Sequence, residues 1–319
     1  MKRSTLKPKI LLIGAAGFLG TYILKNLLHS KYDVTCLIHN KPLDDVPLFK
    51  SVKIVNGSVM DAKLMHQLVR NADVIIHSAR AQTQSDTPNH AVTVQGIQNI
   101  ITPAHNNWQN NNYEKRMQNS PKHIIFISSV AAAKKNIDAY ARTKKIAEKL
   151  LQESNLRVTV LRPNFIFGKN APGFGRMLRS ILSFPFVFVL GNGKTLLQPI
   201  YAGDVALAVE AAIMHPPKHK KPFLLLDVAG KKPITYDAFI RKLMTAFGMR
   251  KSIVHVPVHL VILLTRALAQ FTNSLPFDAT TVKSFVENAT AETKELEKRL
   301  HMKVQSYEKQ IKKLLAELR

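Results

Sequence analysis

The chain has 319 residues, 46% of them hydrophobic and 21% charged, which is ordinary for a globular protein of one large or two modest domains. Its net charge of +25 is spread along the whole length. This argues against a dedicated nucleic-acid-binding arm and is interpreted first as a generally basic, solvated surface. The alternative is attraction to anionic cofactors, acidic lipids or nucleic acid. A single cysteine, Cys36, excludes an internal disulfide, and a cytoplasmic location is expected.

A buried strand and a glycine-rich turn are predicted near the start of the chain. Ile10–Ile13 is apolar, Gly14, Gly17 and Gly20 follow, and Phe18–Leu28 has a helical pattern. Such glycines permit a tight bend, a close approach of backbone to a pyrophosphate, and close packing of helix on sheet. The lysines ahead of the strand also allow a secretion signal, but a helix and a strand follow instead of a cleavage site. The stretch therefore predicts the first turn of a dinucleotide-binding fold.

The second predicted strand, 34–38, ends where dinucleotide-binding folds select their ribose. An Asp or Glu at this place binds the 2′-hydroxyl of NAD. The chain has His39, Asn40 and Lys41 there, and no acid before Asp44. A cation without a carboxylate favours the 2′-phosphate of NADP, and NAD stays open as the alternative.

Strands and helices continue to alternate up to residue 161. Short apolar runs separated by helical patterns are typical of buried parallel strands, so the predicted fold class is α/β, a Rossmann-type doubly wound sheet. The further expected strands are 52–55, 74–76, 123–127 and 158–161, and the expected helices are 62–69, 91–101 and 139–153. The polar, asparagine-rich segment His105–Lys122 is expected to be an exposed excursion.

A candidate catalytic group lies around the fifth strand. Ser128 and Ser129 end this strand, and Tyr140 and Lys144 follow, four residues apart on one face of a helix. Tyrosine can donate a proton to the alkoxide that hydride transfer leaves, and it needs a nearby cation to favour its phenolate. Lys144 would supply that cation, and a serine would orient the substrate oxygen.

Beyond Pro163 the alternation loosens, and a smaller, mostly helical lobe is expected to shape the substrate pocket. Asp204 is expected to cap a helix that ends at Ile213, and Thr235 a helix that ends at Phe247. Residues 222–228 predict one more buried strand. A C-terminal stripe predicts a helix packed on the lobe: Tyr307, Ile311, Leu314, Leu315 and Leu318. We expect a dinucleotide-binding domain at 1–165, with returning segments at about 200–230, and a lobe at 166–199 and 231–319.

Val258–Phe271 is the most hydrophobic helix candidate. It is too short to cross a bilayer, and His259 and Arg266 interrupt it. It is interpreted first as a core helix. The alternative is an interfacial helix that brings the protein to the periphery of an anionic membrane.

The motifs together resemble the extended and atypical short-chain dehydrogenases/reductases, the group similar to NAD-dependent epimerases and dehydratases. The motifs GAAGFLG, ADVIIHSAR, FISS, YARTK and VLRPNFIFG occur in the order of that superfamily. The resemblance covers residues 8–170 well, and the stretch 190–213 extends it. Within the superfamily the chain looks most like the NAD(P)-binding group related to an accessory subunit of respiratory complex I.

The resemblance implies a cofactor site along one edge of the sheet. The pyrophosphate would lie against Gly14, Gly17, Phe18 and Leu19. The adenosine end would lie near Ser58 and Val59, with His39 and Lys41 at the ribose. Ser78, Ala79 and Arg80 would follow the cofactor, and Pro163, Tyr140 and Lys144 would meet its nicotinamide end. The resemblance also selects Ser129 over Ser128 as the catalytic serine.

Some residues depart from the family pattern. Ser58 stands where an acid is common, and Thr93 stands where an Asn helps a proton relay in many relatives. No acid lies between Ile124 and Ile137, which argues against dehydration. Phe165, Phe174 and Gln198 are interpreted as pocket lining or as core.

The expected function is an NAD(P)-dependent oxidoreductase with NADP(H) slightly preferred, which acts on a small-molecule carbonyl or alcohol through Ser129, Tyr140 and Lys144. The alternatives are a non-catalytic NADPH-binding scaffold or redox sensor, and a sugar-nucleotide epimerase. No specific nucleic-acid partner is expected. No metal site is expected, because the histidines and the one cysteine lack ligand spacing.

Overall fold

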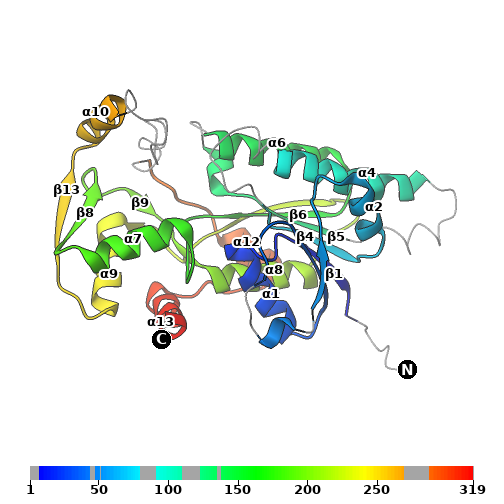
Figure 1. The fold of residues 1–319 in the computed structure, drawn as a ribbon, viewed down its shortest axis with the longest axis horizontal. Coiled ribbons are helices and arrows are strands. Elements are labelled where there is room, and N and C mark those ends of the chain that lie inside the picture. Colours follow the sequence, from blue (N-terminus) through cyan, green and yellow to red (C-terminus); the bar gives the residue numbers. More distant parts are fainter. Residues whose placement is uncertain are drawn as a thin grey trace.

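The computed structural model describes residues 7–43, 47–50, 52–79, 91–109, 123–134, 138–268 and 287–318. Within these residues a seven-stranded parallel sheet forms the centre of the molecule, in the order β11-β6-β5-β4-β1-β2-β3 (Figure 1). Its strands are β1 (Lys9–Ile13), β2 (Asp33–Ile38), β3 (Lys53–Asn56), β4 (Val74–His77), β5 (His123–Ile127), β6 (Val158–Pro163) and β11 (Phe223–Val228). The predicted α/β class with a doubly wound sheet is confirmed.

The central strands are apolar on both faces because helices cover both sides of the sheet. Along β1, Ile10 and Leu12 enter one hydrophobic core, and Leu11 and Ile13 enter the other. In β5 all five residues are buried. This continuous burial explains why these strands read as unbroken apolar runs in the sequence.

The helices form two layers (Figure 1). One layer holds α2 (Ala62–Arg70), α4 (Gly96–Gln109) and α6 (Ala139–Glu153), and the other holds α1 (Phe18–His29), α8 (Ala202–Met214) and α12 (Lys294–Leu300). Short helical turns occur at Pro47–Phe49 and Val130–Ala133, and a π turn at Ala91–Gln95 precedes α4. Leu296 and Leu300 of α12 pack in the core with α1 and α8, although the predicted division places them in the lobe.

The direction of the chain through the sheet reverses between β1 and β4. From β1 the chain moves outward to β2 and β3, and then returns to β4 on the other side of β1. All strands are parallel, and the register pairs Ile13 with His77 and Ile127 with Leu161. Their carboxyl ends therefore meet at one edge, which is where doubly wound sheets bind their ligands.

A third hydrophobic core forms the C-terminal lobe. Phe167, Phe174 and Phe239 lie at its centre, each less than 2% exposed. Its helices are α7 (Pro172–Ser183), α9 (Tyr236–Ala246), α10 (Val258–Leu268) and α13 (Tyr307–Leu318). Three two-stranded sheets accompany them: β7 (Ile166–Phe167) with β10 (Ile200–Tyr201), β9 (Leu196–Leu197) with β12 (Ile234–Thr235), and β8 (Phe186–Leu190) with β13 (Ser252–Val256).

Two helix predictions in the lobe are confirmed. The Thr235 hydroxyl accepts a hydrogen bond from the Ala238 N–H at 3.2 Å and so caps α9. On α13 the predicted stripe buries Tyr307, Ile311 and Leu314, while Leu318 stays 38% exposed. The C-terminal helix thus packs on the lobe through its first two turns.

The prediction that Asp204 caps a helix is wrong. β10 runs directly into α8, so Tyr201 is the cap residue and Asp204 lies inside the first turn. There it is fully buried and accepts a hydrogen bond from Lys313 Nζ at 2.7 Å. The acid stabilises the positive end of the helix and binds α13 to α8 instead of capping.

Two further predictions are corrected, one about secondary structure and one about burial. The excursion at His105–Lys122 is helical at its start, because α4 extends to Gln109; residues 110–122 lie outside the described part of the chain. The interpretation of Val258–Phe271 as a core helix is wrong for the part that the structure describes. On α10, Leu260 and Leu263 are 43% and 65% exposed.

Candidate active site

The glycine turn after β1 is packed against the end of β4. Gly14 has a φ of +88°, and a Cβ at this position would lie 2.6 Å from the Ala79 nitrogen. The Ser78 N–H donates to the Ile13 carbonyl at 2.9 Å, so the two strand exits are joined. A Cβ at Gly20 would lie only 2.0 Å from the Gly14 carbonyl oxygen. The close approach of helix and strand therefore requires glycine at both 14 and 20.

The N-terminus of α1 lies directly behind this turn and is suited to an anion. Gly17 is its cap residue and makes no side-chain capping bond, and no acid occurs in the first turn. The N–H groups of Phe18 and Leu19 have no acceptor within the helix, and the helix dipole adds positive potential. A pyrophosphate fits such a site, because the missing side chain at Gly17 leaves the backbone open.

The predicted adenosine-end residues lie around the exits of β2 and β3. His39 and Lys41 are exposed just after β2. The Gly57 N–H donates to the Ile38 carbonyl at 2.9 Å, which holds the next turn, with Ser58 and Val59, beside them. The Ser58 hydroxyl accepts from the Met60 N–H at 3.1 Å. Arg80, also predicted to follow the cofactor, lies outside the described residues.

Lys144 is buried between the fifth strand and Tyr140. Its Nζ donates to the Ile127 carbonyl at 2.8 Å and lies 4.6 Å from the centre of the Phe126 ring. The Tyr140 ring centre is 5.8 Å from the same nitrogen. α6 carries both residues and is capped by Asp138, whose carboxylate accepts from the Ala141 N–H at 2.8 Å. The ammonium is therefore fixed beside the tyrosine and attached to the end of the strand that leads to the serines.

The charge of Lys144 also affects its buried neighbour His77 at the end of β4. Burial, with a further contribution from the Lys144 charge, lowers the pKa of His77 to about 3. His77 is fully buried and its ring packs 5.7 Å from that of Phe126. At neutral pH this histidine is uncharged.

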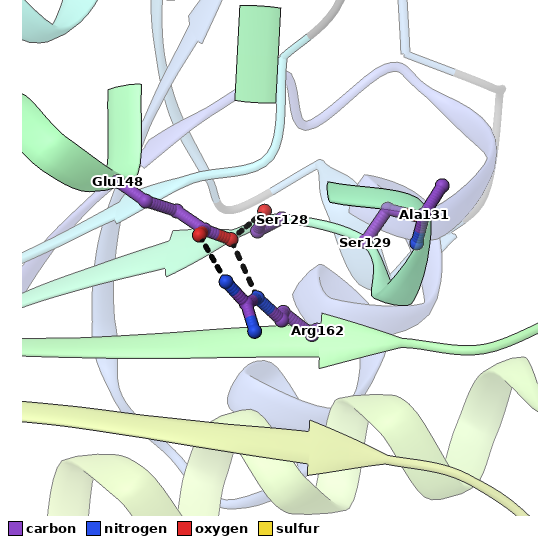
Figure 2. Close-up of polar contacts among 5 residues, drawn as sticks. All are labelled: Ser128, Ser129, Ala131, Glu148 and Arg162. Carbon is purple, nitrogen blue, oxygen red and sulfur yellow. Dashed lines mark hydrogen bonds and ion pairs between the residues drawn. The ribbon is translucent and has the colours of Figure 1, made fainter. Parts of the chain in front are cut away.

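The two adjacent serines have different surroundings (Figure 2). Ser128 is buried and its hydroxyl donates to the Glu148 carboxylate. Ser129 is partly exposed, and its hydroxyl accepts from the Ala131 N–H at 3.2 Å at the start of the following 3-10 turn. Figure 2 shows Ser128 directed toward Glu148, while Ser129 and Ala131 lie away from this pair. Ser129 is thus the more exposed of the two serines, and Ser128 is engaged by Glu148.

Glu148 and Arg162 form a buried ion pair that sequence reasoning missed. Arg162 on β6 donates through Nε to Glu148 Oε1 at 2.8 Å and through Nη2 to Oε2. These hydrogen bonds raise the pKa of Arg162. Asp227 pairs with Arg162 across the β6–β11 register, and partial burial raises the pKa of its carboxyl while Arg162 opposes the rise. Glu148, Arg162 and Asp227 thus form a row of charged side chains next to Ser128.

A signal for Glu148 was present in the sequence. Tyr140, Lys144 and Glu148 recur every four residues and share one face of α6. The absence of acids between Ile124 and Ile137 therefore says nothing about acids that the fold brings near the serine. Here the acid contacts Ser128 and Arg162.

Several other predicted residues are buried or half-buried. Phe174 is 1% exposed in the lobe core, so its core interpretation is confirmed. Gln198 is 2% exposed and bonds the Gly230 carbonyl at 2.7 Å and the Ala291 N–H at 2.8 Å. Phe165 is half-buried against Phe239, with ring centres 6.3 Å apart. Pro163 is buried at the end of β6.

Known proteins were compared with the chain. The model of the 3-beta hydroxysteroid dehydrogenase/isomerase family matches residues 11–258. The sterol-4-alpha-carboxylate 3-dehydrogenase, decarboxylating, of Homo sapiens is 23% identical over 265 residues, 77% of this chain and 68% of that protein. The UDP-glucose 4-epimerase of Vibrio cholerae is 26% identical over 246 residues, 69% and 71% of the two chains.

Another relative and a solved structure extend this picture. Subunit 9 of the NADH dehydrogenase [ubiquinone] 1 alpha subcomplex, mitochondrial, of Dictyostelium discoideum is 22% identical over 236 residues, 71% of this chain and 60% of that protein. The Thermotoga maritima UDP-glucose 4-epimerase, solved with UDP-glucose, superposes with a TM-score of 0.73 and 17% identity, covering 97% and 98% of the two chains. At 17% identity, this structural similarity shows that the two proteins share a fold.

Proposed function

Because the chain belongs to the 3-beta hydroxysteroid dehydrogenase/isomerase family, we propose that it is an NAD(P)-dependent oxidoreductase. This family membership agrees with the resemblance of its motifs to the extended short-chain dehydrogenases/reductases. It transfers a hydride to or from a small-molecule carbonyl or alcohol. Ser129, Tyr140 and Lys144 carry the proton chemistry.

One observation carries the proposal. The buried Lys144 ammonium joins the carbonyl of Ile127, the last residue of β5, while lying 5.8 Å from the Tyr140 ring centre. The tyrosine, the cation and the serine turn are thereby held on one rigid unit.

Side chains of this protein orient the substrate oxygen and move the proton in the proposed reaction. Ser129 donates a hydrogen bond to the substrate carbonyl oxygen and orients it. As the carbon gains a hydride, Tyr140 gives its hydroxyl proton to that oxygen, and in the reverse direction its phenolate takes the proton back. The Lys144 charge stabilises the phenolate. The nicotinamide, when bound, supplies or accepts the hydride.

The cofactor is proposed to lie across the exits of β1, β2 and β4. Gly14, Gly17, Phe18 and Leu19 hold its pyrophosphate, and Ser78 and Ala79 follow its path. Exposed His39 and Lys41, with no acid before Asp44, favour the 2′-phosphate of NADP. Replacing Lys41 by Glu should therefore weaken binding of NADPH and leave binding of NADH unchanged or improved.

Two alternative functions have support of their own. A sugar-nucleotide epimerase is supported by the 26% identity to the Vibrio cholerae enzyme. A cofactor-binding scaffold without turnover is supported by the similarity to the complex I subunit and by Thr93, which is 2% exposed where many relatives carry a relay Asn.

Native mass spectrometry of the purified protein, followed by a carbonyl screen with NADPH and NADH, separates these functions. Exchangeable NADPH that is oxidised as a carbonyl is reduced supports the oxidoreductase. Tightly retained NAD+ identifies the epimerase, and bound NADPH without turnover identifies the scaffold. Lys144→Met should abolish turnover, while Lys145→Met, on the exposed side of the same helix, should not.

A further inference from the structure

The small sheet of β8 and β13 has one covered face and one open face. Val187 and Val189 are 1% and 0% exposed and pack in the lobe core. The alternate residues Phe186 and Phe188 are 49% and 51% exposed. Phe188 pairs in register with Val254 of β13, which is 39% exposed. The outward side of this sheet is therefore apolar.

Exposed apolar residues also occur on the elements before β8 and after β13. Leu182 and Phe184, at the end of α7, are 48% and 51% exposed, and the Phe184 ring lies edge-on to Phe188 with centres 6.4 Å apart. Leu260 and Leu263 follow on α10. We name this set the apolar face: Leu182, Phe184, Phe186, Phe188, Val254, Leu260 and Leu263. Figure 1 shows β8, β13 and α10 together at the end of the molecule farthest from the seven-stranded sheet.

The concentration of these residues is unusual. Seven of the thirteen large apolar residues that are exposed in the described part of the chain belong to the apolar face. Scattered exposed apolar residues need no explanation, but a contiguous group indicates a surface that contacts something else.

The backbone under the apolar face is held in place. Lys251 donates from Nζ to the carbonyls of Ile181, Leu182 and Phe184, at 2.6, 3.1 and 2.7 Å. This one cation thus satisfies carbonyls at the end of α7 and connects them to the start of β13. The backbone from which Phe184 projects is therefore held by Lys251.

The charges around the apolar face indicate its partner. Residues 172–203 and 238–268, which supply every element of this surface, contain eight Lys and Arg and no Asp or Glu. Arg179, Lys194 and Arg250 are exposed. Two acids directly adjoin these ranges: Asp204, which is buried and bonded to Lys313, and Asp237, which is bonded to His255 at 2.9 Å. Apolar side chains beside exposed arginines and lysines match a bilayer with anionic headgroups.

We propose that the C-terminal lobe docks on an anionic membrane through the apolar face. The phenylalanines enter the headgroup region, and the surrounding arginines and lysines attract the lipid phosphates. No helix in the described ranges is long and apolar enough to cross a bilayer, so the contact is made from one side. Docking on the membrane does not depend on the proposed oxidoreductase activity, so it can be tested whether or not the protein shows turnover.

Vesicle flotation of the full chain tests the proposal. The protein should float with vesicles of phosphatidylcholine and phosphatidylserine at least tenfold more than with phosphatidylcholine alone, and salt should reduce this binding. The triple variant Phe184→Ser, Phe186→Ser, Phe188→Ser should lower partitioning at least tenfold. The matched control Leu207→Ser, Met214→Ser changes residues 42% and 58% exposed on α8 and should float like the wild type.

A charge variant keeps the test valid if the triple variant does not fold. Arg179→Glu with Arg250→Glu should weaken binding to anionic vesicles at least tenfold, while Lys145→Glu with Lys309→Glu should not. Failure of the wild type to float overturns the proposal, as does equal flotation of the triple variant. A dimer in light scattering that the triple variant dissociates also overturns it, because a second copy would then cover the apolar face.

Discussion

The central strands of the seven-stranded sheet and the strand β8 of the small β8–β13 sheet have similar apolar content, yet only the central strands are covered on both faces. All five residues of β5 are buried between two helix layers. In β8 burial alternates, and Phe186 and Phe188 face outward. An apolar run therefore identifies a strand, but elements distant in sequence decide whether its second face is closed. The closed sheet gives stability and a rigid site edge, and the open one gives a surface for contact.

The largest contrast is expected from the same substitution in the two regions. Gly20→Ala places a methyl group 2.0 Å from the Gly14 carbonyl oxygen, so helix α1 must move from the sheet. We expect a loss of about 3 kcal/mol in the free energy of unfolding and loss of nucleotide binding. Gly173→Ala on α7 in the lobe meets nothing within 4 Å and should be neutral. Urea unfolding measures both; equal effects would mean that α1 does not pack this closely.

The next comparison is between an ion pair near the sheet and an ion pair on the surface of the lobe. Glu148→Ala leaves Arg162 buried without its main partner, and should cost about 3 kcal/mol. Glu308→Ala removes an ion pair with Lys242 that lies on the surface of the lobe, and should cost less than about 1 kcal/mol. Thermal unfolding of the two variants compares them. A small effect for Glu148 would show that its ion pair with Arg162 is solvated.

The charged network also shows where prediction from sequence ends. The pair Ser128 and Ser129, with Tyr140 and Lys144, could be singled out because their spacing predicts a strand end and one helix face. The choice of Ser129 over Ser128 came from the family resemblance. Glu148 became visible as a partner of Ser128 only once α6 was packed on β5 and β6. Its contact with Arg162 joins helix α6 to strand β6, and no local sequence pattern predicts that these two residues lie close together.

The elements of the fold follow the same division. Helix 139–153 and the sheet strands were predicted to within about two residues, because turn residues and continuous burial mark their ends. Asp204 failed as a cap because β10 enters α8 without a turn. The prediction that α10 is a core helix was wrong because the hydrophobicity of a segment does not show whether another part of the chain covers it.

Acid should affect the sheet before the lobe. His77 and His123 are buried in β4 and β5, and burial lowers both pKa values to about 3. The unfolded chain binds these protons from about pH 6.5 downward, so stability is complete above pH 6.5 and falls toward pH 3. At pH 5 each histidine should remove about 1–2 kcal/mol. His123→Gln keeps a donor for Thr159 and should flatten urea-unfolding stability between pH 7 and 5; an unchanged slope would contradict this.

The smallest effect is expected on the open face. Phe186→Ser should change the free energy of unfolding by less than about 1 kcal/mol, because the ring is already half in water. Val187→Ser, one residue along the same strand, buries a hydroxyl in the lobe core and should cost about 2 kcal/mol or more. Reversal of this order in chemical denaturation would show that the apolar face is covered within the chain.

The central claim is that Tyr140 transfers the proton in a hydride-transfer reaction. It is tested most directly by measuring turnover and nucleotide binding of Tyr140→Phe, which keeps the ring beside Lys144 and removes only the hydroxyl. We predict that turnover falls at least a hundredfold while the Kd for NADPH stays within about twofold, and that Tyr32→Phe changes neither. Unchanged turnover in Tyr140→Phe would contradict the account.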